Sequence, residues 1–190
     1  MSDDILHLLV KGDDGVGKTS LVQAFVTKSC IVAEFDPTLE ETSRAVVEID
    51  DEPVVVDVFD SAEQEEFHSL AKIEYKAQQI QYTDGIVLVF SVTDRISFDS
   101  LAKHYQTIQT AKSCGLNTKP LKLCIVGTKT DNQEMRQVSI SDAEEFAQSV
   151  SAPYFETSAK QGINCDAPFL SITKCCVSPD TSSSDLSSKN

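Results

Sequence analysis

The stretch of sequence that decides the fold runs Gly12-Asp13-Asp14-Gly15-Val16-Gly17-Lys18-Thr19. It fits the pattern G-x-x-x-x-G-K-[ST], in which glycines let the backbone turn so that consecutive N–H groups face one anion. The apolar run Ile5–Lys11 before it predicts a buried strand, and Lys18–Lys28 after it carries apolar residues at helical spacing. The start of such a helix adds its positive end to the loop. The sequence therefore predicts that this loop binds the phosphates of a nucleotide.

The loop supplies a set of phosphate contacts. Lys18 is expected to reach the β- and γ-phosphates, and the Thr19 hydroxyl is expected to ligate Mg²⁺. The residues predicted to bind the nucleotide at this end are Asp14, Gly15, Val16, Gly17, Lys18, Thr19 and Ser20. A mere strand-to-helix turn is the alternative, but the apolar strand before the loop and the amphipathic helix after it disfavour that interpretation. The loop alone leaves the base open, because ATPases and kinases share it.

Strand and helix signals continue along the chain. Two β-branched runs, Thr42–Ile49 and Val54–Phe59, predict an antiparallel hairpin with a slightly long turn, and the apolar run Ile86–Val92 predicts a strand buried on both faces. The other predicted elements are a helix over Ser97–Ser113, a strand over Leu121–Gly127, a helix capped by Ser139 or Ser141, a strand over Tyr154–Thr157, and a final helix near Cys165–Cys176 that Pro168 should keep short.

The order of these elements predicts the fold class. A strand, a helix, a hairpin and then alternating strands and helices argue for an α/β sandwich with a mainly parallel six-stranded sheet and one antiparallel edge strand. Residues 1–177 are expected to form one domain. Residues 178–190 are rich in serine and cannot bury a core, so they are predicted to be a disordered tail.

Composition narrows the class of protein. The 190 residues carry a formal net charge of −14, which disfavours binding to nucleic acid and simple adhesion to anionic lipid. The six cysteines form no C-x-x-C pair, so neither a zinc site nor a disulfide framework is indicated. Reduced thiols are typical of an intracellular protein. We therefore expect a cytoplasmic protein that does not bind nucleic acid.

Further motifs follow the first helix and the third, fifth and sixth strands. They are Asp36–Glu41, Asp60–Glu65, Thr128–Asp131 and Glu156–Lys160. Each motif is a weak signal alone, but together with the phosphate loop they resemble the Ras subfamily of small GTPases in order and spacing, over about residues 4–174. The resemblance implies the three-layer G-domain sandwich of the P-loop NTPases, and a protein that cycles between GTP and GDP.

The residue types fit guanine. The carboxylate of Asp131 can accept hydrogen bonds from both guanine N1–H and the exocyclic amine, a pair of donors that adenine does not offer. The resemblance implies that Lys129 packs its stem along the base, and that the backbone N–H of Ala159 meets guanine O6. The predicted base-binding residues are Thr128, Lys129, Asp131, Ser158, Ala159 and Lys160. A polar turn after a strand is the alternative, and the phosphate loop upstream disfavours it.

The resemblance also implies which residues bind Mg²⁺ and which residue orients the attacking water. Thr38 resembles the switch I threonine that gives Mg²⁺ a ligand in the triphosphate state, and Asp60 resembles the carboxylate that holds Mg²⁺ through water. Gln64 resembles the glutamine that orients the attacking water. Ras-type proteins are themselves a type case of this phosphoryl-transfer chemistry. The predicted metal residues are Thr19, Thr38 and Asp60, and the predicted catalytic residues are Gln64 and Lys18.

Two residues depart from the family pattern where the γ-phosphate is expected. Asp14 stands in place of a glycine, so its side chain should crowd Gln64 and an incoming arginine finger; a tolerated surface substitution is the alternative. Glu63 replaces the glycine of the D-x-x-G motif in switch II, and it loses the conformational freedom of that glycine. These departures predict impaired hydrolysis and weakened discrimination between GTP and GDP.

Further departures concern the base and switch II. Ile31, expected to contact the nucleotide, stands where the family often has an aromatic residue over the guanine, so nucleotide should exchange faster. Thr128 replaces the commoner asparagine, a substitution that the Rho branch shares. The helix-prone segment Lys72–Gln79 makes the chain about five residues longer than typical Ras between Phe67 and Asp84, and it is expected to lengthen the switch II helix.

The resemblance implies three kinds of protein partner. A guanine-nucleotide exchange factor, a GTPase-activating protein and an effector are expected to bind through Asp36–Glu41 and switch II, and the protein is expected to be a monomer. The chain ends Ser187-Ser188-Lys189-Asn190 without the C-a-a-X prenylation signal. Cys175-Cys176 could be palmitoylated, but buried or merely exposed thiols are the favoured interpretation. We therefore expect weak or indirect membrane contact, with any membrane fraction peripheral at the cytoplasmic face of the plasma membrane.

Three functions compete. The leading hypothesis is a GTP-hydrolysing signalling switch. The second is a nucleotide-binding interaction module with impaired hydrolysis, for which Asp14 and Glu63 are the reason. The third, a P-loop kinase or ATPase, is disfavoured by Asp131 and by the Ser158-Ala159-Lys160 run.

Overall fold

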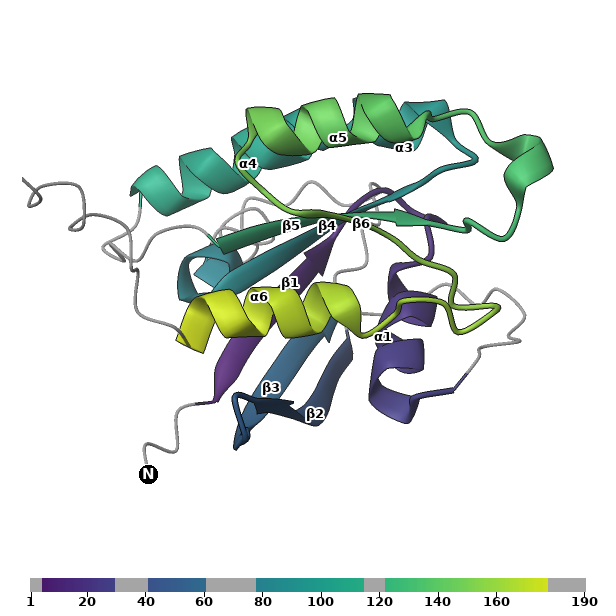
Figure 1. Cartoon of the computed structure of the whole chain (residues 1–190). Helices are drawn as coiled ribbons and strands as arrows, with labels where there is room; N and C mark the ends of the chain where they lie inside the picture. Colours follow the sequence, from purple (N-terminus) through teal and green to yellow (C-terminus); the bar gives the residue numbers. More distant parts are fainter. Residues whose placement is uncertain (1–4, 30–40, 61–77, 115–121, 178–190) are drawn as a thin grey trace, which may run out of the picture.

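The computed structural model describes residues 5–29, 41–60, 78–114 and 122–177 (Figure 1). Its strands are β1 (Leu6–Lys11), β2 (Glu41–Ile49), β3 (Glu52–Asp60), β4 (Gly85–Ser91), β5 (Lys122–Thr128) and β6 (Tyr154–Glu156). Its helices are α1 (Lys18–Thr27), α3 (Arg95–Asp99), α4 (Leu101–Cys114), α5 (Ile140–Ser149) and α6 (Ala167–Val177). Residues 78–82 are also helical, and Gln133–Met135 form a single 3₁₀ turn.

The strands form one six-stranded sheet in the order β2-β3-β1-β4-β5-β6. Only β2 pairs in the antiparallel sense, with β3, and it lies at the edge, whereas every other neighbouring pair is parallel. The predicted fold class is confirmed. The carboxyl ends of the parallel strands therefore share one edge of the sheet, where open α/β sheets bind their ligands.

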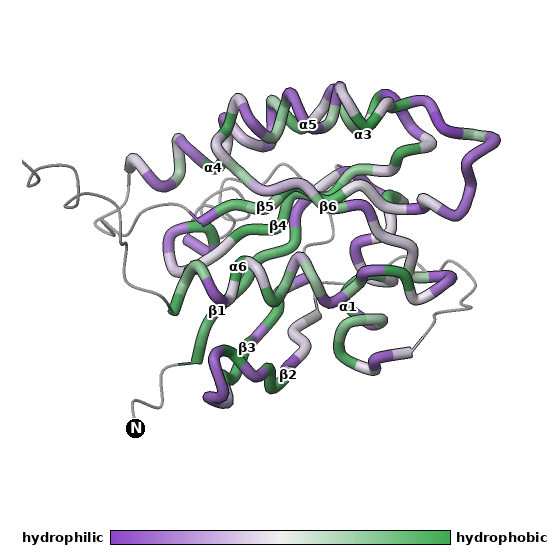
Figure 2. The backbone as a smooth tube through the Cα atoms, in the orientation of Figure 1, coloured by the Kyte–Doolittle hydropathy of each residue, from purple (hydrophilic) through white to green (hydrophobic). Residues whose placement is uncertain are grey.

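Helices cover both faces of the sheet and produce three layers (Figure 1). On one face, Leu21 and Phe25 of α1 and Phe169 of α6 pack in a core with the apolar side chains of β1 and β3. On the other face, α3, α4 and α5 enclose a second core around Phe90, in which Leu101 and Ile108 are fully buried. Figure 2 shows the apolar strands lying between the two helical layers. All seven residues of β4 are buried, as the continuous apolar run predicted.

Two details of the predicted elements were wrong. The β2–β3 hairpin has a tight turn of two residues, because Ile49 pairs with Glu52 and both Asp50 and Asp51 take positive φ angles. The expected helix over Ser97–Ser113 is two helices, and the first begins earlier. Asp94 caps it, because its carboxylate accepts hydrogen bonds from the backbone N–H groups of Ile96 and Ser97.

Of the last two helices, α5 follows its predicted capping signal, whereas the length of α6 is a third difference from the predicted elements. Ser139, rather than Ser141, caps α5 through a 3.0 Å bond from the backbone N–H of Asp142. The final helix is 11 residues long, so the expectation of a short helix was wrong. Pro168 is its second residue and therefore lies in the first turn, where proline removes no helical hydrogen bond. None of the helices in the described ranges is long and apolar enough to cross a membrane.

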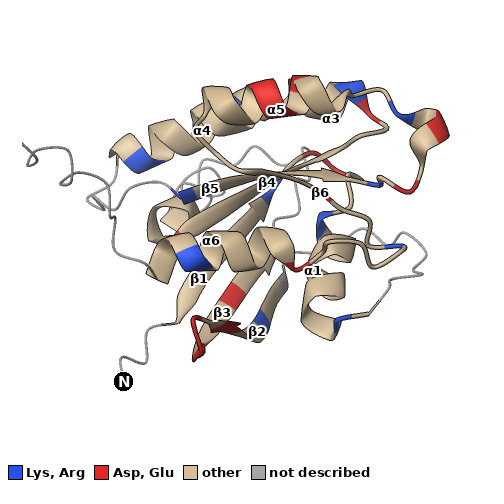
Figure 3. Cartoon of the chain, viewed as in Figure 1, with Lys and Arg blue, Asp and Glu red and all other residues tan. Residues whose placement is uncertain are grey.

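Acidic residues gather at the turn between β2 and β3 (Figure 3). Glu48, Asp50, Asp51 and Glu52 lie there, at the amino end of β3. Asp60 closes the same strand at its carboxyl end, which borders the phosphate loop. This concentration of negative charge is thus at the opposite end of β3 from the place where an anionic ligand is expected.

Candidate functional site

The phosphate loop joins the end of β1 to the start of α1. Lys18 folds its side chain back over the loop, and its Nζ donates to the carbonyls of Gly12 at 2.8 Å and Asp13 at 2.9 Å. Lys18 is 7% exposed. A buried ammonium held by loop carbonyls sits where the phosphates are expected, so the loop presents positive charge to an anion.

Two glycines in the loop are required by geometry. A Cβ at Gly12 would lie 2.0 Å from the carbonyl oxygen of Val89, so no other residue fits against β4 there. Gly17, the N-cap of α1, has φ 101°, a left-handed conformation in which side chains are strained. Gly17 itself has no side chain with which to cap this helix end. The first N–H groups of the helix, which lack helical partners, therefore face the space in which a phosphate would bind.

Thr19 and Asp60 meet at the carboxyl ends of β1 and β3. The Thr19 hydroxyl donates to Asp60 Oδ2 at 2.5 Å, and Asp60 is only 5% exposed. A hydroxyl and a carboxylate oxygen, both hard donors, are the ligands that Mg²⁺ prefers beside phosphates. The two predicted metal residues in the described part of the chain thus fit the cation. Thr38, the third, lies outside the described residues.

The loops after β5 and β6 lie together and present the predicted base-binding residues. The Ser158 hydroxyl, which is fully buried, donates to Asp131 Oδ1 at 2.6 Å. Thr130 binds the carbonyl of Thr157 through its backbone N–H at 3.3 Å and its hydroxyl at 3.0 Å. Asp131 is therefore oriented through one carboxylate oxygen while it stays half-buried. These bonds hold the two loops side by side, as a shared site for the base would require.

Two side chains connect the base-binding loops to the phosphate loop. Lys129 has a backbone φ angle of 61°, and its Nζ donates to the carbonyl of Gly15 at 2.7 Å. The buried hydroxyl of Thr128 lies 2.5 Å from the carbonyl of Val16 and 3.0 Å from that of Phe90. Threonine at position 128 thus ties the phosphate loop to β4 and β5, which gives a structural reason for its presence.

A set of hydrogen bonds on Glu156, at the start of the base-binding loop, was not predicted. Arg136 donates to both carboxylate oxygens of Glu156 at 2.8 Å, and the Tyr154 hydroxyl donates to one of them at 2.9 Å. Burial opposes ionisation of Glu156, but these bonds outweigh it and hold its pKa below the ordinary value. Burial raises the pKa of Tyr154, and the charge of Glu156 adds to that effect. Sequence spacing offered no signal for Arg136, because its partner lies 20 residues further on.

Asp14 lies at the rim of the phosphate loop. Its side chain is 62% exposed, and its Oδ1 is 3.9 Å from Lys18 Nζ. The carboxylate is therefore close enough to interact with the lysine that is expected to contact the phosphates, yet it remains in solvent. Because the carboxylate of this pair lies in solvent, the pair contributes little to stability.

Several predicted residues lie outside the described ranges. They are Ile31, Thr38, Glu63, Gln64, Asp36–Glu40 of the effector segment, and residues 72–77 of the expected switch II extension. Within the described ranges, the structure brings Lys18, Thr19, Asp60, Asp131 and Ser158 to the same edge of the sheet.

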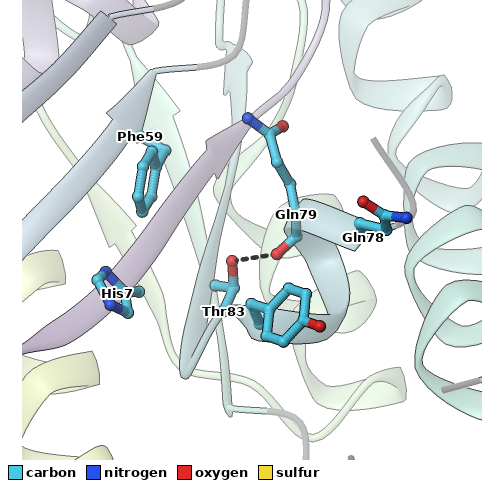
Figure 4. A pocket seen from close by; sticks show the side chains of 6 residues that line it. His7, Phe59, Gln78, Gln79 and Thr83 are labelled. Atoms are coloured by element: carbon cyan, nitrogen blue, oxygen red, sulfur yellow. Dashed lines mark hydrogen bonds between the residues drawn. The ribbon is translucent and has the colours of Figure 1, made fainter. Parts of the chain in front are cut away.

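A separate pocket of about 230 Å³ lies beside β1 and the segment that enters β4 (Figure 4). It is lined by His7, Phe59, Gln78, Gln79, Tyr82 and Thr83. The rings of His7 and Phe59 are 5.6 Å apart between centroids. The pocket shares no residue with the phosphate loop or the base-binding loops, so it is not part of the candidate nucleotide site.

Comparison with known proteins identifies relatives across most of the chain. The sequence model of the Ras family matches residues 7–178. Ras-like protein 1 of Saccharomyces cerevisiae is 40% identical over 167 residues, which are 88% of this chain and 51% of the yeast protein. Ras-like protein RAS2 of Hydra vulgaris is 36% identical over 177 residues, 92% of this chain and 87% of that protein.

A third relative extends the same pattern. Ras-like protein rasC of Dictyostelium discoideum is 34% identical over 171 residues, 90% of this chain and 85% of that protein. The chain spans about half the length of the yeast relative and most of the length of the other two.

Proposed function

This chain belongs to the Ras family of small GTPases, and we propose that it binds GDP and GTP with Mg²⁺ as a signalling switch whose GTP hydrolysis is weak. The observation that carries the proposal is the convergence of three features at one edge of the sheet. They are the lysine held over the phosphate loop, the Thr19–Asp60 oxygen pair, and the Asp131 carboxylate oriented by Ser158.

Each feature has a role in the proposed cycle. Lys18 and the N–H groups at the start of α1 bind the phosphates, and Asp131 accepts from the guanine edge, with Lys129, Ala159 and Lys160 around the base. Thr19 and Asp60 would hold Mg²⁺, which would supply positive charge to offset that of the phosphates. Gln64 orients the attacking water, and Thr38, Ile31 and Glu63 complete the nucleotide contacts as the family resemblance implies.

The proposal of weak hydrolysis rests on Asp14 and Glu63. The Asp14 carboxylate is 3.9 Å from Lys18. It brings negative charge to the place where negative charge also builds on the transferred phosphoryl group, and it occupies space that an arginine finger would enter. The second candidate function, a nucleotide-binding interaction module without significant turnover, is favoured by the same observation.

A single-turnover experiment tests the hydrolysis proposal. GTP hydrolysis is measured with and without a GTPase-activating protein, on the wild type, on Asp14→Gly and on Asp51→Gly. Asp51 is a matched control, because it lies in the exposed β2–β3 turn at φ 68°, where glycine fits. Slow wild-type turnover that Asp14→Gly accelerates, while Asp51→Gly does not, supports the proposal. Brisk wild-type turnover eliminates weak hydrolysis and leaves an ordinary switch.

The Glu63 proposal concerns the difference between the two nucleotide states. We expect similar affinity for GDP and for a slowly hydrolysed GTP analogue, because glutamate restricts the backbone of switch II. Backbone amide NMR of both complexes measures whether switch II changes. A large GTP-dependent change in switch II contradicts this part of the proposal.

The partners and location follow from family membership. Exchange factors, GTPase-activating proteins and effectors would bind through Asp36–Glu41 and switch II of a monomer. The folded unit would be residues 1–177, with a cytoplasmic pool and at most weak or indirect membrane contact.

A further inference from the structure

His104 occupies a core position of α4. The buried residues of this helix follow the spacing Leu101, His104, Ile108 and Ala111, which is the stripe of one helical face. Three of the four are apolar. His104 is 7% exposed, and its Nε2 lies 2.6 Å from Asp13 Oδ1, a residue 91 positions earlier in the chain. A histidine in an apolar stripe needs a polar partner, and here that partner belongs to the phosphate loop.

Asp13 makes a second contact through its backbone. Its carbonyl accepts from Lys18 Nζ at 2.9 Å, so one residue joins α4 through its side chain and the phosphate-binding lysine through its main chain. The side chain of Asp13 is 30% exposed. Fixing this side chain against α4 also fixes the peptide whose oxygen receives Lys18.

Charge gives the contact a second consequence. The phosphate loop carries two neighbouring carboxylates, Asp13 and Asp14, although its ligand is an anion. Asp14 projects into solvent at the rim, whereas Asp13 is turned to a histidine of the neighbouring helix. The imidazole donates a hydrogen bond to the carboxylate, and so its negative charge is partly satisfied before phosphates arrive.

We propose that His104 is a positioning residue for the nucleotide site: it holds the Asp13 carboxylate against α4 and thereby fixes the loop carbonyl that receives Lys18. This inference rests on the proposed function, because it requires that a nucleotide binds at the loop. His104 itself touches no phosphate. Its effect on nucleotide retention passes through Asp13.

The test is a double-mutant cycle read out by GDP dissociation. The variants are His104→Phe, Asp13→Ala and the double variant, each loaded with a fluorescent GDP in Mg²⁺ and chased with excess GDP. His104→Phe leaves the Asp13 carboxylate facing an apolar ring, so we expect GDP to dissociate about tenfold faster. Adding Asp13→Ala to His104→Phe removes the unsatisfied carboxylate. We therefore expect the GDP dissociation rate of the double variant to lie within about twofold of the rate of Asp13→Ala alone.

A matched control uses the same substitution elsewhere. His7→Phe replaces a histidine of β1 whose ring is tilted against that of Phe59 in the separate pocket, and we expect its GDP dissociation rate to equal that of the wild type. Thermal unfolding of every variant with excess GDP reports on packing separately. A purely structural role for His104 would lower the unfolding temperature of His104→Phe without changing GDP dissociation.

The outcomes separate this inference from the proposed function. If GDP binds and His104→Phe releases it at the wild-type rate, or if Asp13→Ala does not suppress the effect of His104→Phe, the inference is overturned and the proposed function stands. If the wild-type chain retains no GDP, the proposed function fails first, and the inference fails with it.

Discussion

The two ends of the candidate site are built differently. At the base end, the loops after β5 and β6 hold each other through direct bonds, with Asp131 fixed by Ser158 and Glu156 braced by Arg136. At the phosphate end, the loop carries adjacent carboxylates, one turned to a helix and one left in solvent. The base end is therefore organised for recognition. The phosphate end places negative charge next to an anionic ligand, and we therefore expect binding and turnover to be separable properties of this chain.

The largest expected effect lies at the base end. Asp131→Asn replaces an acceptor of two guanine N–H groups by an amide that can accept at only one atom. Two hydrogen bonds to a charged group are weakened, so we expect GDP affinity to fall by roughly 10³-fold. Isothermal titration calorimetry of the wild type and the variant measures the affinities.

A xanthine nucleotide controls for damage to the fold. Xanthine carries a carbonyl where guanine carries the exocyclic amine, so the side-chain amide that Asp131→Asn introduces would donate to it and restore binding. If the variant loses GDP binding and gains no binding of xanthosine diphosphate, the substitution disturbed the loop rather than the recognition, and the contrast between the two ends loses its basis.

Thr128→Val breaks the connection between the two ends. The substitution keeps the shape of the side chain but removes the hydroxyl that lies against the carbonyls of Val16 and Phe90. Two buried carbonyls lose a partner, at a cost of about 1–3 kcal/mol in the free energy of unfolding. We also expect GDP to dissociate roughly tenfold faster, because Val16 is part of the phosphate loop. Urea unfolding and stopped-flow release measure the two quantities.

The same substitution on an exposed helix is the control. Thr107 donates to the carbonyl of Lys103 on the surface of α4 and contacts neither end of the site. Thr107→Val should leave GDP dissociation unchanged. If Thr128→Val destabilises the fold while GDP dissociation stays at the wild-type rate, the two ends are not coupled through this hydroxyl.

Glu156→Gln tests the rigidity of the base end. The bonds from Arg136 and Tyr154 favour ionised Glu156, so we expect the variant to lose about 1–2 kcal/mol of unfolding free energy at pH 7. The pKa of Glu156 is lowered in the folded state from an ordinary value of 4.5. Its contribution is therefore complete above about pH 4.5 and is lost as the pH falls through the folded-state pKa.

The measurement is the difference in unfolding free energy between the wild type and Glu156→Gln across pH. It should be constant between pH 7 and about pH 5.5 and shrink below pH 4.5. When both proteins also carry Arg136→Ala, the difference in unfolding free energy between Glu156 and Gln at position 156 should largely disappear. A difference that grows on acidification would contradict the assigned sign.

Much of this arrangement could be predicted from the sequence. Apolar runs located the strands, the glycine loop indicated the phosphate site, and the family resemblance assigned Asp60, Asp131 and Ser158 to the same nucleotide. Prediction from neighbouring residues failed where the same residue types can adopt more than one backbone conformation. The acidic turn of the β2–β3 hairpin did not reveal that Asp50 and Asp51 would take positive φ angles, and the break at Ser100 between α3 and α4 has no glycine or proline to mark it.

Contacts between distant segments were beyond such rules. Arg136 comes from the connection before α5, and His104 lies in an apolar helical stripe. Nothing in the sequence near either residue names its carboxylate partner. Both pairs depend on how α4 and the loops pack on the sheet, and only tertiary structure supplies that information. The contacts that were not predicted, Arg136 with Glu156 and His104 with Asp13, are made to residues within or beside the predicted binding loops.

The smallest expected effect is that of Asp14 on GDP affinity. It tests whether the phosphate end affects turnover without affecting binding. Asp14→Gly removes an exposed carboxylate 3.9 Å from Lys18, and exposed ion pairs contribute at most about 1 kcal/mol. We therefore expect GDP affinity to change by less than about fivefold, even though the same substitution is expected to accelerate hydrolysis. Asp14→Asn, which keeps the size of the side chain and the backbone restriction, controls for the freedom of glycine. A large gain in GDP affinity in both variants would show that Asp14 repels the bound phosphates. The phosphate end would then limit binding as well as turnover, and the two properties would no longer be separable.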